Sequence, residues 1–324
     1  MYKLYTAERG EHRKTTLVLR KSEEGFPLAL RGGLLALGCF DGLHPGHRAL
    51  ISSARDLAEQ LGVPLGVWSP AGAKRTGELM PLCDKLEALA ALDVDFYIED
   101  PFEKLRDLCP ETFFKEILLE RYGACALACG ENFTFGRGGV GTAETLADLC
   151  QKRGMTLLVA ELKREEGEVI SSALVRSALA EGDLMRARRL LGAPYGFSAS
   201  VVHGRKVGRD LGFPTANLPL PKDTPLKRGV YALWVYLEGV GYPALANVGV
   251  HPTFKEAAEP LLEVYLLETP PDADLYGKSL YVEFLRFLRP ERAFCSPEEL
   301  IAQIEMDLKR AREEVFSHKE AESS

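Results

Sequence analysis

The chain has 324 residues, of which 46% are hydrophobic and 27% are charged. This length predicts about two domains, and this balance excludes disordered, collagen-like and coiled-coil chains. The formal net charge of −7 argues against nucleic acid as a partner, although local basic loops could still bind a small phosphorylated ligand.

The ends of the chain and its cysteines indicate a compartment. The N-terminal residues lack the apolar core and cleavage site of a signal peptide. No run approaches the roughly 18 apolar residues of a membrane span, so no membrane partner is expected. The seven cysteines form no C-x-x-C pair, and their odd number suits a disulfide framework badly. We therefore expect a reducing, cytoplasmic location, and we interpret Cys125 and Cys129 as buried thiols on a strand.

The first half of the chain alternates predicted strands and helices. The apolar run 34–39 is typical of a strand buried on both faces of a parallel sheet. A helix follows it, ended by Gly62. Further strands are predicted at 64–68, 95–98, 124–129 and 156–161, and helices near 84–92, 111–121 and 143–153. This order predicts a doubly wound, Rossmann-like α/β domain, whose ligands bind beyond the carboxyl ends of the strands. Segment 1–30 carries no functional signal.

The second half is mostly β. After a short helix at 183–191 the pattern breaks, so we place a domain boundary near 182–195 and expect domains at 1–182 and 183–324. Short β-like segments separated by Gly and Pro predict a small closed barrel; they lie near 197–203, 229–238, 242–248, 261–267 and 279–287. Ser296 and Glu299 form a capping box that begins a C-terminal helix.

The first chemical motif is GCFDGLHPGH at residues 38–47. The strand delivers the chain into this loop, and the free N–H groups of the following helix favour a phosphate. His44 and His47 can both point at one polyphosphate, and Gly46 lets the backbone approach it closely. The alternative is that the two histidines are only partly exposed polar residues at a helix start.

This string resembles the nucleotidyltransferase signature of bacterial bifunctional riboflavin kinase/FAD synthetases. GENFTFG at 130–136 and ISSALVR at 170–176 resemble two further motifs of that family, and LLGAPY at 190–195 resembles its domain junction. The resemblance implies FMN adenylyltransferase activity with His44, His47 and Arg176 as catalytic residues. It also implies two sets of binding residues. The residues that bind ATP are Gly38, Phe40, Asp41, Gly46, Ser171 and Ser172. The residues that bind flavin are Asn132 and Phe133.

Segment 170–176 also has a physical interpretation of its own. Ser171 or Ser172 can cap a helix, and Arg176 one turn later could grip a triphosphate bidentately. An ordinary capped helix with a solvated arginine is the alternative. Three positions depart from the family pattern. Ala173 replaces the usual threonine, Cys39 replaces the usual asparagine, and the histidine that normally follows Pro70 is absent.

The second motif is GRKVGRDLGFPTAN at 204–217. A loop so rich in glycine and cations can wrap phosphates, and Thr215 and Asn217 offer hard oxygen ligands on one side of an extended segment. A surface hairpin is the alternative. The stretch closely resembles the riboflavin kinase signature. That resemblance implies Mg²⁺ binding by Thr215 and Asn217, and phosphate binding by Gly204, Arg205, Lys206, Gly208, Arg209 and Gly212.

Segments 247–253, 262–267, 275–278 and 287–294 also resemble riboflavin kinase motifs. The resemblance implies a six-stranded Greek-key barrel and flavin binding by Arg289. Glu263 stands between apolar residues of a strand, so it either pairs with a nearby cation or acts as a general base. The resemblance makes Glu263 the catalytic base. We interpret its neighbour Glu268 as a solvated turn residue.

Together these features predict an enzyme of flavin cofactor biosynthesis. It would convert riboflavin and ATP to FMN, and FMN and ATP to FAD, with Mg²⁺, as a monomer or weak homo-oligomer. One alternative is a riboflavin kinase whose N-terminal domain is a degenerate scaffold or regulator. Another is a flavin-binding regulator without enzymatic activity.

Overall fold

A computed structural model of the chain describes residues 3–7, 14–20, 26–72, 77–203, 213–221, 223–250, 260–268 and 274–317. The chain forms two compact units. The N-terminal unit consists of Met1–Arg75 and Leu82–Ser171, and the C-terminal unit consists of Thr76–Pro81 and Ser172–Ser324. Among the described helices, none has the length and apolarity to cross a membrane.

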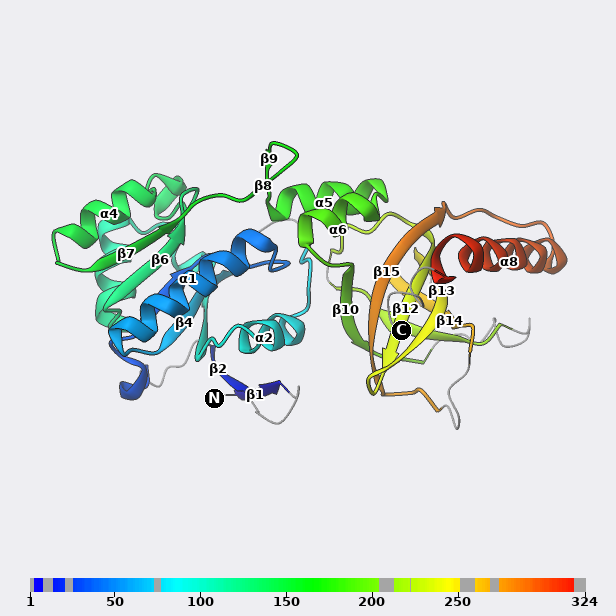
Figure 1. Ribbon diagram of the computed structural model, residues 1–324, viewed down its shortest axis with the longest axis horizontal. Helices are drawn as coiled ribbons and strands as arrows, with labels where there is room; N and C mark the ends of the chain where they lie inside the picture. The colour runs from blue at the N-terminus through cyan, green and yellow to red at the C-terminus, as the bar shows by residue number, and fades with distance from the viewer. Residues whose placement is uncertain are drawn as a thin grey trace. The chain divides into compact units, whose positions relative to one another are not determined.

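A seven-stranded sheet organises the N-terminal unit (Figure 1), in the order β1-β2-β5-β4-β3-β6-β7. All its neighbouring strands are parallel except β1 and β2. The strands are β1 (Lys3–Ala7), β2 (Lys14–Arg20), β3 (Leu34–Leu37), β4 (Leu65–Ala71), β5 (Phe96–Pro101), β6 (Ala126–Gly130) and β7 (Thr156–Ala160). The predicted doubly wound α/β fold is confirmed. The first two strands lie in segment 1–30, where the sequence predicted none.

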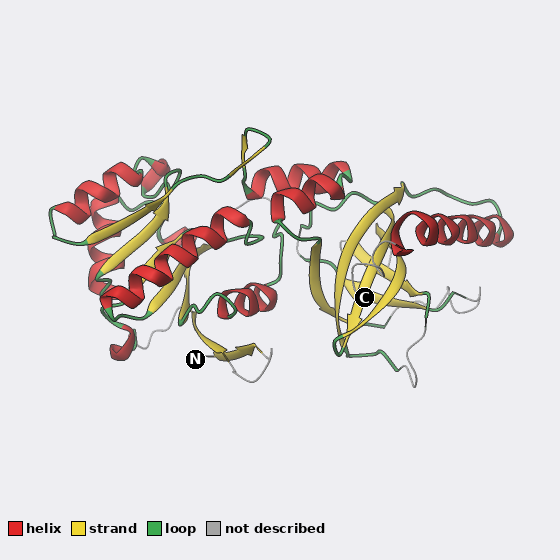
Figure 2. Cartoon of the chain, viewed as in Figure 1, coloured by secondary structure: helices red, strands yellow, loops and turns green. Residues whose placement is uncertain are grey.

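Helices flank this sheet (Figure 2). The π-helix η3 and α4 pack on one face, against a core that includes Leu35, Trp68 and Leu127. Central strand β3 is buried along its whole length, as expected for a strand covered on both faces. The helical segments are α1 (Pro45–Leu61), α2 (Leu82–Ala90), α3 (Pro110–Thr112), η3 (Phe113–Arg121) and α4 (Ala143–Gln151), with the short hairpin β8 (Arg164–Glu165) and β9 (Glu168–Val169) after β7.

The cysteines differ in burial. Cys129 lies on β6 and is fully buried with Cys150 of α4 in the same core. Cys125 precedes β6 and is exposed, so the prediction of a buried strand thiol was wrong for it. It lies in the bend before the strand, where its N–H donates to the carbonyl of Gly33. All seven cysteines are free thiols.

Burial sets the reactivity expected of these thiols. It raises the pKa of Cys129 from its ordinary value of 9.0 to about 12 and that of Cys150 to about 11. Both therefore stay protonated at about pH 8, and only the thiolate reacts with alkylating agents. We expect mass spectrometry after native alkylation to find Cys295 modified and these two unmodified. Alkylation in denaturant is the control for all seven, and native labelling of Cys129 as fast as Cys295 would contradict the prediction.

The C-terminal unit is built on a curled, six-stranded antiparallel sheet in the order β10-β15-β12-β13-β14-β11. One bridge between Val202 and Asn217 joins the edges formed by β10 and β11. This arrangement confirms the predicted barrel fold. The strands are β10 (Tyr195–Ser200), β11 (Thr215–Pro219), β12 (Gly229–Leu237), β13 (Val240–Val250), β14 (Pro260–Leu266) and β15 (Ser279–Arg289).

The remaining helices are α5 (Ser172–Glu181), α6 (Leu184–Leu191), α8 (Pro297–Ala311) and the π-helical turn η5 (Arg312–Phe316). The last two cover the outer face of the curled sheet through Ala311, Val315 and Phe316. Ser296 caps α8 as predicted, because its hydroxyl accepts from the N–H of Glu299. The carboxylate of Glu299 accepts from the N–H of Cys295, one residue before the position that a capping box uses.

Candidate active sites

The loop between β3 and α1 has an unusual backbone. Phe40, Gly42 and Leu43 all have positive φ angles, of 47°, 78° and 38°. Phe40 and Leu43 tolerate this conformation because their side chains are fully buried, so core packing compensates for the backbone strain. The turn delivers His44 to the N-cap of α1, where its side chain makes no capping hydrogen bond. Pro45 has no N–H and the N–H of Arg48 donates to the carbonyl of His44, so the first-turn N–H groups that could bind an anion are those of Gly46 and His47.

The two histidines of this loop form a stacked pair. Their ring centroids lie 3.7 Å apart with an interplanar angle of 20°, and Phe40 packs on His47 at 5.2 Å. His44 is only 7% exposed and Asp41 only 6%, whereas His47 is half-buried. The structure thus brings together the predicted histidines, the aromatic ring and the carboxylate at the start of α1.

Two glycines make this packing possible. A Cβ atom at Gly46 would lie 3.2 Å from Cε1 and Nδ1 of the His44 ring, and one at Gly38 would lie 3.2 Å from the Phe40 ring. Both contacts are closer than ordinary van der Waals packing. The absence of a side chain at these positions therefore sets how closely loop and rings approach each other.

Two polar residues outside the predicted motifs hold the same loop. The hydroxyl of Ser69 and the ammonium of Lys85 both donate to the carbonyl oxygen of Cys39, at 3.3 and 3.4 Å. Sequence reasoning missed both residues. They lie on β4 and α2, 30 and 46 residues from Cys39, and no local pattern marks them.

The second predicted motif follows β6. Asn132 is exposed and Phe133 is half-buried, with its ring stacked on Phe135 at 5.7 Å. Phe135 belongs to the core, so Phe133 has a rigid support. Both predicted flavin-binding residues therefore lie at the carboxyl end of a parallel strand, where ligands of such sheets bind.

The third motif crosses the border between the units. Ser171 is the last residue of the N-terminal unit, whereas Ser172 and Arg176 belong to the C-terminal unit. Arg176 is 9% exposed, and its Nε donates to the carbonyl oxygen of Gly77 at 2.7 Å. The solvated arginine of the alternative interpretation is therefore wrong. Its action together with His44 and His47 stays a prediction.

In the C-terminal unit, sheet pairing brings polar residues together across three strands. Glu263 on β14 lies directly opposite Asn217 on β11 and Asn247 on β13. Directly opposed side chains point to the same face of an antiparallel sheet. The flanking Leu262 and Val264 point to the other face and are fully buried. Alternation along the strand thus explains how a carboxylate stands in an apolar strand.

Thr215 lies two residues before Asn217 on β11, on the same face. Asn217 is 6% exposed and its backbone carbonyl accepts from Val202, so its position is fixed. A hydroxyl and an amide oxygen on one rigid strand fit a hard cation such as Mg²⁺. The predicted phosphate-binding residues Gly204, Arg205, Lys206, Gly208, Arg209 and Gly212 lie outside the described residues.

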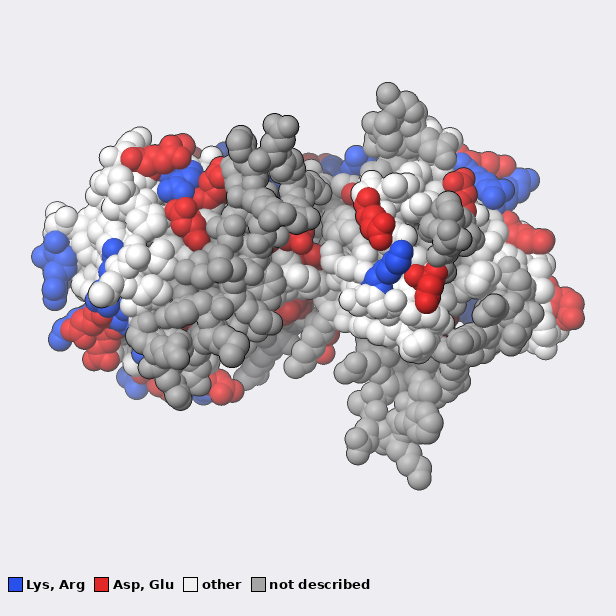
Figure 3. Space-filling view, turned by 90° about the horizontal axis from the view of Figure 1, so that it is seen from below, with Lys and Arg blue, Asp and Glu red and all other residues white. Residues whose placement is uncertain are grey.

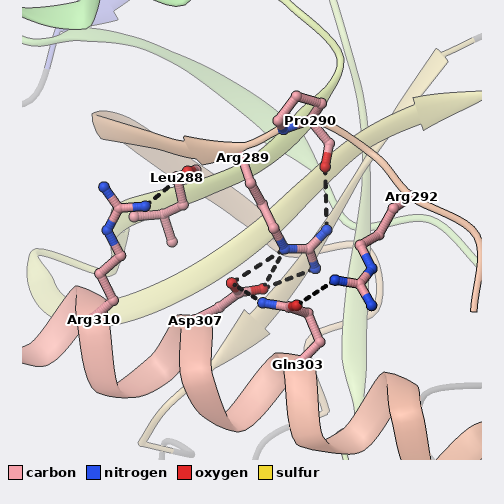
Figure 4. A network of polar contacts seen from close by, with 7 residues as sticks. All are labelled: Leu288, Arg289, Pro290, Arg292, Gln303, Asp307 and Arg310. Atoms are coloured by element: carbon pink, nitrogen blue, oxygen red, sulfur yellow. Dashed lines mark hydrogen bonds and ion pairs between the residues drawn. The ribbon is translucent and has the colours of Figure 1, made fainter.

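Arg289, the predicted flavin-binding residue, pairs with Asp307 of α8 (Figure 4). Its Nε donates to both carboxylate oxygens at 3.1 and 2.9 Å, and its NH2 group lies 2.8 Å from Oδ2. The side chains are only 18% and 7% exposed. Gln303 donates to the same carboxylate. This network ties the end of β15 to α8, and flavin binding by Arg289 stays a prediction.

Asp307→Asn is expected to destabilise the C-terminal unit by about 3 kcal/mol, because it leaves a largely buried guanidinium without its counter-charge. Urea unfolding followed by tryptophan fluorescence measures this, since Trp234 packs in the same cluster as the end of α8. Glu305→Gln removes an exposed carboxylate from the same helix and is the matched control. Equal stability of the two variants would contradict a structural role for the pair.

On the face shown in Figure 3, acidic and basic side chains are interspersed, and no continuous basic area appears among the coloured residues. No group of three or more His, Cys, Asp or Glu residues in the described part of the chain could hold a metal ion.

Comparisons with known proteins follow the same division. A family model for FAD synthetase matches residues 27–174, and one for riboflavin kinase matches residues 191–315. The bifunctional riboflavin kinase/FMN adenylyltransferase of Escherichia coli (strain K12) is 36% identical over 294 residues, 87% of this chain and 92% of that protein. The bifunctional riboflavin kinase/FMN adenylyltransferase of Bacillus subtilis (strain 168) is 35% identical over 292 residues, which are 86% of this chain and 91% of that protein.

The fold has a counterpart among solved structures. A crystal structure described as a macrolide-efflux protein from Streptococcus pneumoniae matches with a TM-score of 0.75 and 26% identity. The match covers 91% of this chain and 98% of that chain.

Proposed function

The chain belongs to the family of bifunctional riboflavin kinase/FMN adenylyltransferases, and we propose that its two reactions take place at separate sites. It phosphorylates riboflavin to FMN with ATP, and it adenylylates FMN to FAD with ATP. We assign adenylyl transfer to residues 1–182 and riboflavin phosphorylation to residues 183–324. The observation that supports the assignment is a separate cluster of polar residues in each part, namely the stacked histidines at α1 and the Asn217–Glu263 row in the curled sheet.

For the kinase reaction, the terminal ribityl hydroxyl of riboflavin attacks the γ-phosphorus of ATP and ADP leaves. We assign Glu263 the role of general base that accepts the hydroxyl proton. Thr215 and Asn217 would hold Mg²⁺, which, when bound, supplies positive charge to the ATP phosphates. Asn217 lies directly opposite Glu263, an arrangement that would hold the phosphate and the attacking hydroxyl close together.

The assignment of Asn217 as a metal ligand predicts that its loss raises the Mg²⁺ concentration needed for the kinase reaction. Asn217→Ala should raise the Mg²⁺ concentration that gives half-maximal riboflavin phosphorylation by about tenfold or more, because an amide oxygen ligand is lost. Rates of FMN formation over a Mg²⁺ titration measure it. Thr215→Ser keeps a hydroxyl at the neighbouring ligand position and should titrate like the wild type. An unchanged midpoint for Asn217→Ala would remove it from the metal site.

For adenylyl transfer, a phosphate oxygen of FMN attacks the α-phosphorus of ATP, and pyrophosphate leaves with the bridging oxygen. We assign stabilisation of the growing negative charge to His44, His47, Arg176 and the N–H groups at the start of α1. Gly38, Phe40, Asp41 and Gly46 shape the ATP site, with Ser171 and Ser172 as further phosphate ligands. Asn132 and Phe133 contact the flavin. No covalent enzyme intermediate is needed.

A riboflavin kinase with an inactive N-terminal unit is the second candidate. It is favoured by three departures from the family pattern, namely Ala173, Cys39 and the missing histidine after Pro70. The test is chromatography of flavins after incubation of the protein with riboflavin, ATP and Mg²⁺. FAD appearing after FMN supports two active sites. FMN accumulating without FAD, even when FMN is supplied, supports the kinase alone.

We also propose a cytoplasmic location and a monomer or weak homo-oligomer. Support for the location comes from the seven free thiols, since a reducing compartment keeps cysteines unpaired. Sedimentation equilibrium measures the oligomeric state.

A further inference from the structure

Lys85 of α2 places a positive charge beside the loop that the histidines occupy. Its ammonium donates to the carbonyl oxygen of Cys39 at 3.4 Å and lies 5.9 Å from the centroid of the Tyr97 ring. Cys39 stands two residues beyond the end of β3, at the edge of the sheet where ligands bind. Tyr97 is fully buried, so its ring holds a fixed position beside the ammonium.

The hydrogen bond to Cys39 alone does not account for an ammonium at this position. The same carbonyl also accepts from the hydroxyl of Ser69 at 3.3 Å, so the two donors together occupy its two lone pairs, and Lys85 uses only one of its N–H groups there. A half-buried cation loses hydration, and an ammonium has three N–H donors. At least one further acceptor is therefore expected within reach of the Lys85 ammonium.

Two acidic residues near Lys85 offer an alternative acceptor. Glu99 lies opposite Ser69 in the sheet and accepts from the Tyr97 hydroxyl at 3.3 Å. Asp84 precedes Lys85 on α2 and is 8% exposed. If Lys85 has a purely structural role, its ammonium neutralises these carboxylates. The experiment must therefore distinguish a lysine that neutralises protein carboxylates from one that neutralises the phosphates of a substrate.

We propose that Lys85 is an additional phosphate-binding cation of the adenylyl-transfer site. The inference rests on the proposed function of the N-terminal unit. As an oxygen of the FMN phosphate forms its bond to the α-phosphorus of ATP, the bond from that phosphorus to the bridging oxygen breaks. The electron pair leaves with pyrophosphate, and the Lys85 ammonium stabilises the charge that develops on its oxygens.

The first test compares Lys85→Met with Lys85→Arg. Methionine is also an unbranched side chain but has no charge, and it should lower kcat for FAD formation from FMN by about 10²-fold. Arginine should restore the rate to within about tenfold, because it again presents a cation. Riboflavin phosphorylation by the same protein should not change, which shows that the C-terminal unit is folded. Lys115→Met removes an exposed lysine from η3 and should change neither reaction.

The second test separates charge from loop positioning. Lys85→Gln keeps a donor for the Cys39 carbonyl but has no charge, and Ser69→Ala removes the other donor. The proposal expects Lys85→Gln to be as slow as Lys85→Met and Ser69→Ala to be much faster than either. Recovery by glutamine, or an equal loss in Ser69→Ala, would show that Lys85 only positions the loop and would overturn the proposal.

Binding of inorganic pyrophosphate gives a readout that does not need FAD formation. Calorimetric titration should show an affinity at least about tenfold weaker for Lys85→Met and recovered affinity for Lys85→Arg. A wild-type protein that makes FMN but no FAD would refute adenylyl transfer, yet a Lys85-dependent pyrophosphate site would still support the inference. Equal pyrophosphate affinity in the wild type and Lys85→Met would overturn it.

Discussion

Replacing Glu263 by glutamine is expected to slow riboflavin phosphorylation by about 10²–10⁴-fold. The amide has nearly the same shape but cannot accept the proton of the attacking hydroxyl. Leu262 and Val264 on the opposite face of the strand keep their buried positions, so the sheet should remain intact. FAD formation from supplied FMN should be unchanged, because we assign that reaction to a separate site.

Two measurements make this result specific. The rates of FMN formation from riboflavin and of FAD formation from FMN are determined on the same preparation. Glu268→Gln is the matched control, since Glu268 is exposed just after β14 and should have the wild-type rate. If Glu263→Gln turns over at a near-normal rate, Glu263 is not the base, and its place opposite Asn217 must serve another purpose such as binding the hydroxyl.

The fold was predictable because its strongest signals are local. The run 34–39 is apolar on both faces, and the helix after it has a regular apolar stripe ended by Gly62, so β3 and α1 could be located from sequence. Strands β1 and β2 were missed in segment 1–30. β1 is an edge strand paired with β2 alone, and its sequence KLYTA lacks the continuous apolar run that marks a central strand such as β3.

In the two sites, too, the sequence predicted the local groupings of residues and missed contacts between distant residues. His44 and His47 lie in one continuous motif, so sequence predicted that they act together, and the structure stacks their rings. Asn217 and Glu263 are 46 residues apart and become neighbours only through the pairing of β11 with β14. Lys85 reaches Cys39 through a tertiary contact over a similar separation, which no spacing rule reveals.

Replacing His47 by alanine is expected to slow FAD formation from FMN by about 10²–10³-fold while leaving riboflavin phosphorylation unchanged. The imidazole lies on the first turn of α1, stacked on His44 at 3.7 Å, where the N–H groups of the helix and both rings can face the same polyphosphate. Alanine favours the helix and His47 is only half-buried, so the loss should come from missing charge stabilisation rather than from unfolding.

The measurement is the kinetics of both reactions on one preparation, with Ser53→Ala as a control on an exposed position of the same helix. A loss of FAD formation alone means that the two chemistries occupy separate sites, because the kinase constellation is intact. An equal loss of both activities would mean that they share a site or that the variant is misfolded, and thermal unfolding by circular dichroism decides between these. If FAD forms at the wild-type rate, the stacked pair does not stabilise the transition state, and Arg176 with Lys85 must supply the charge instead.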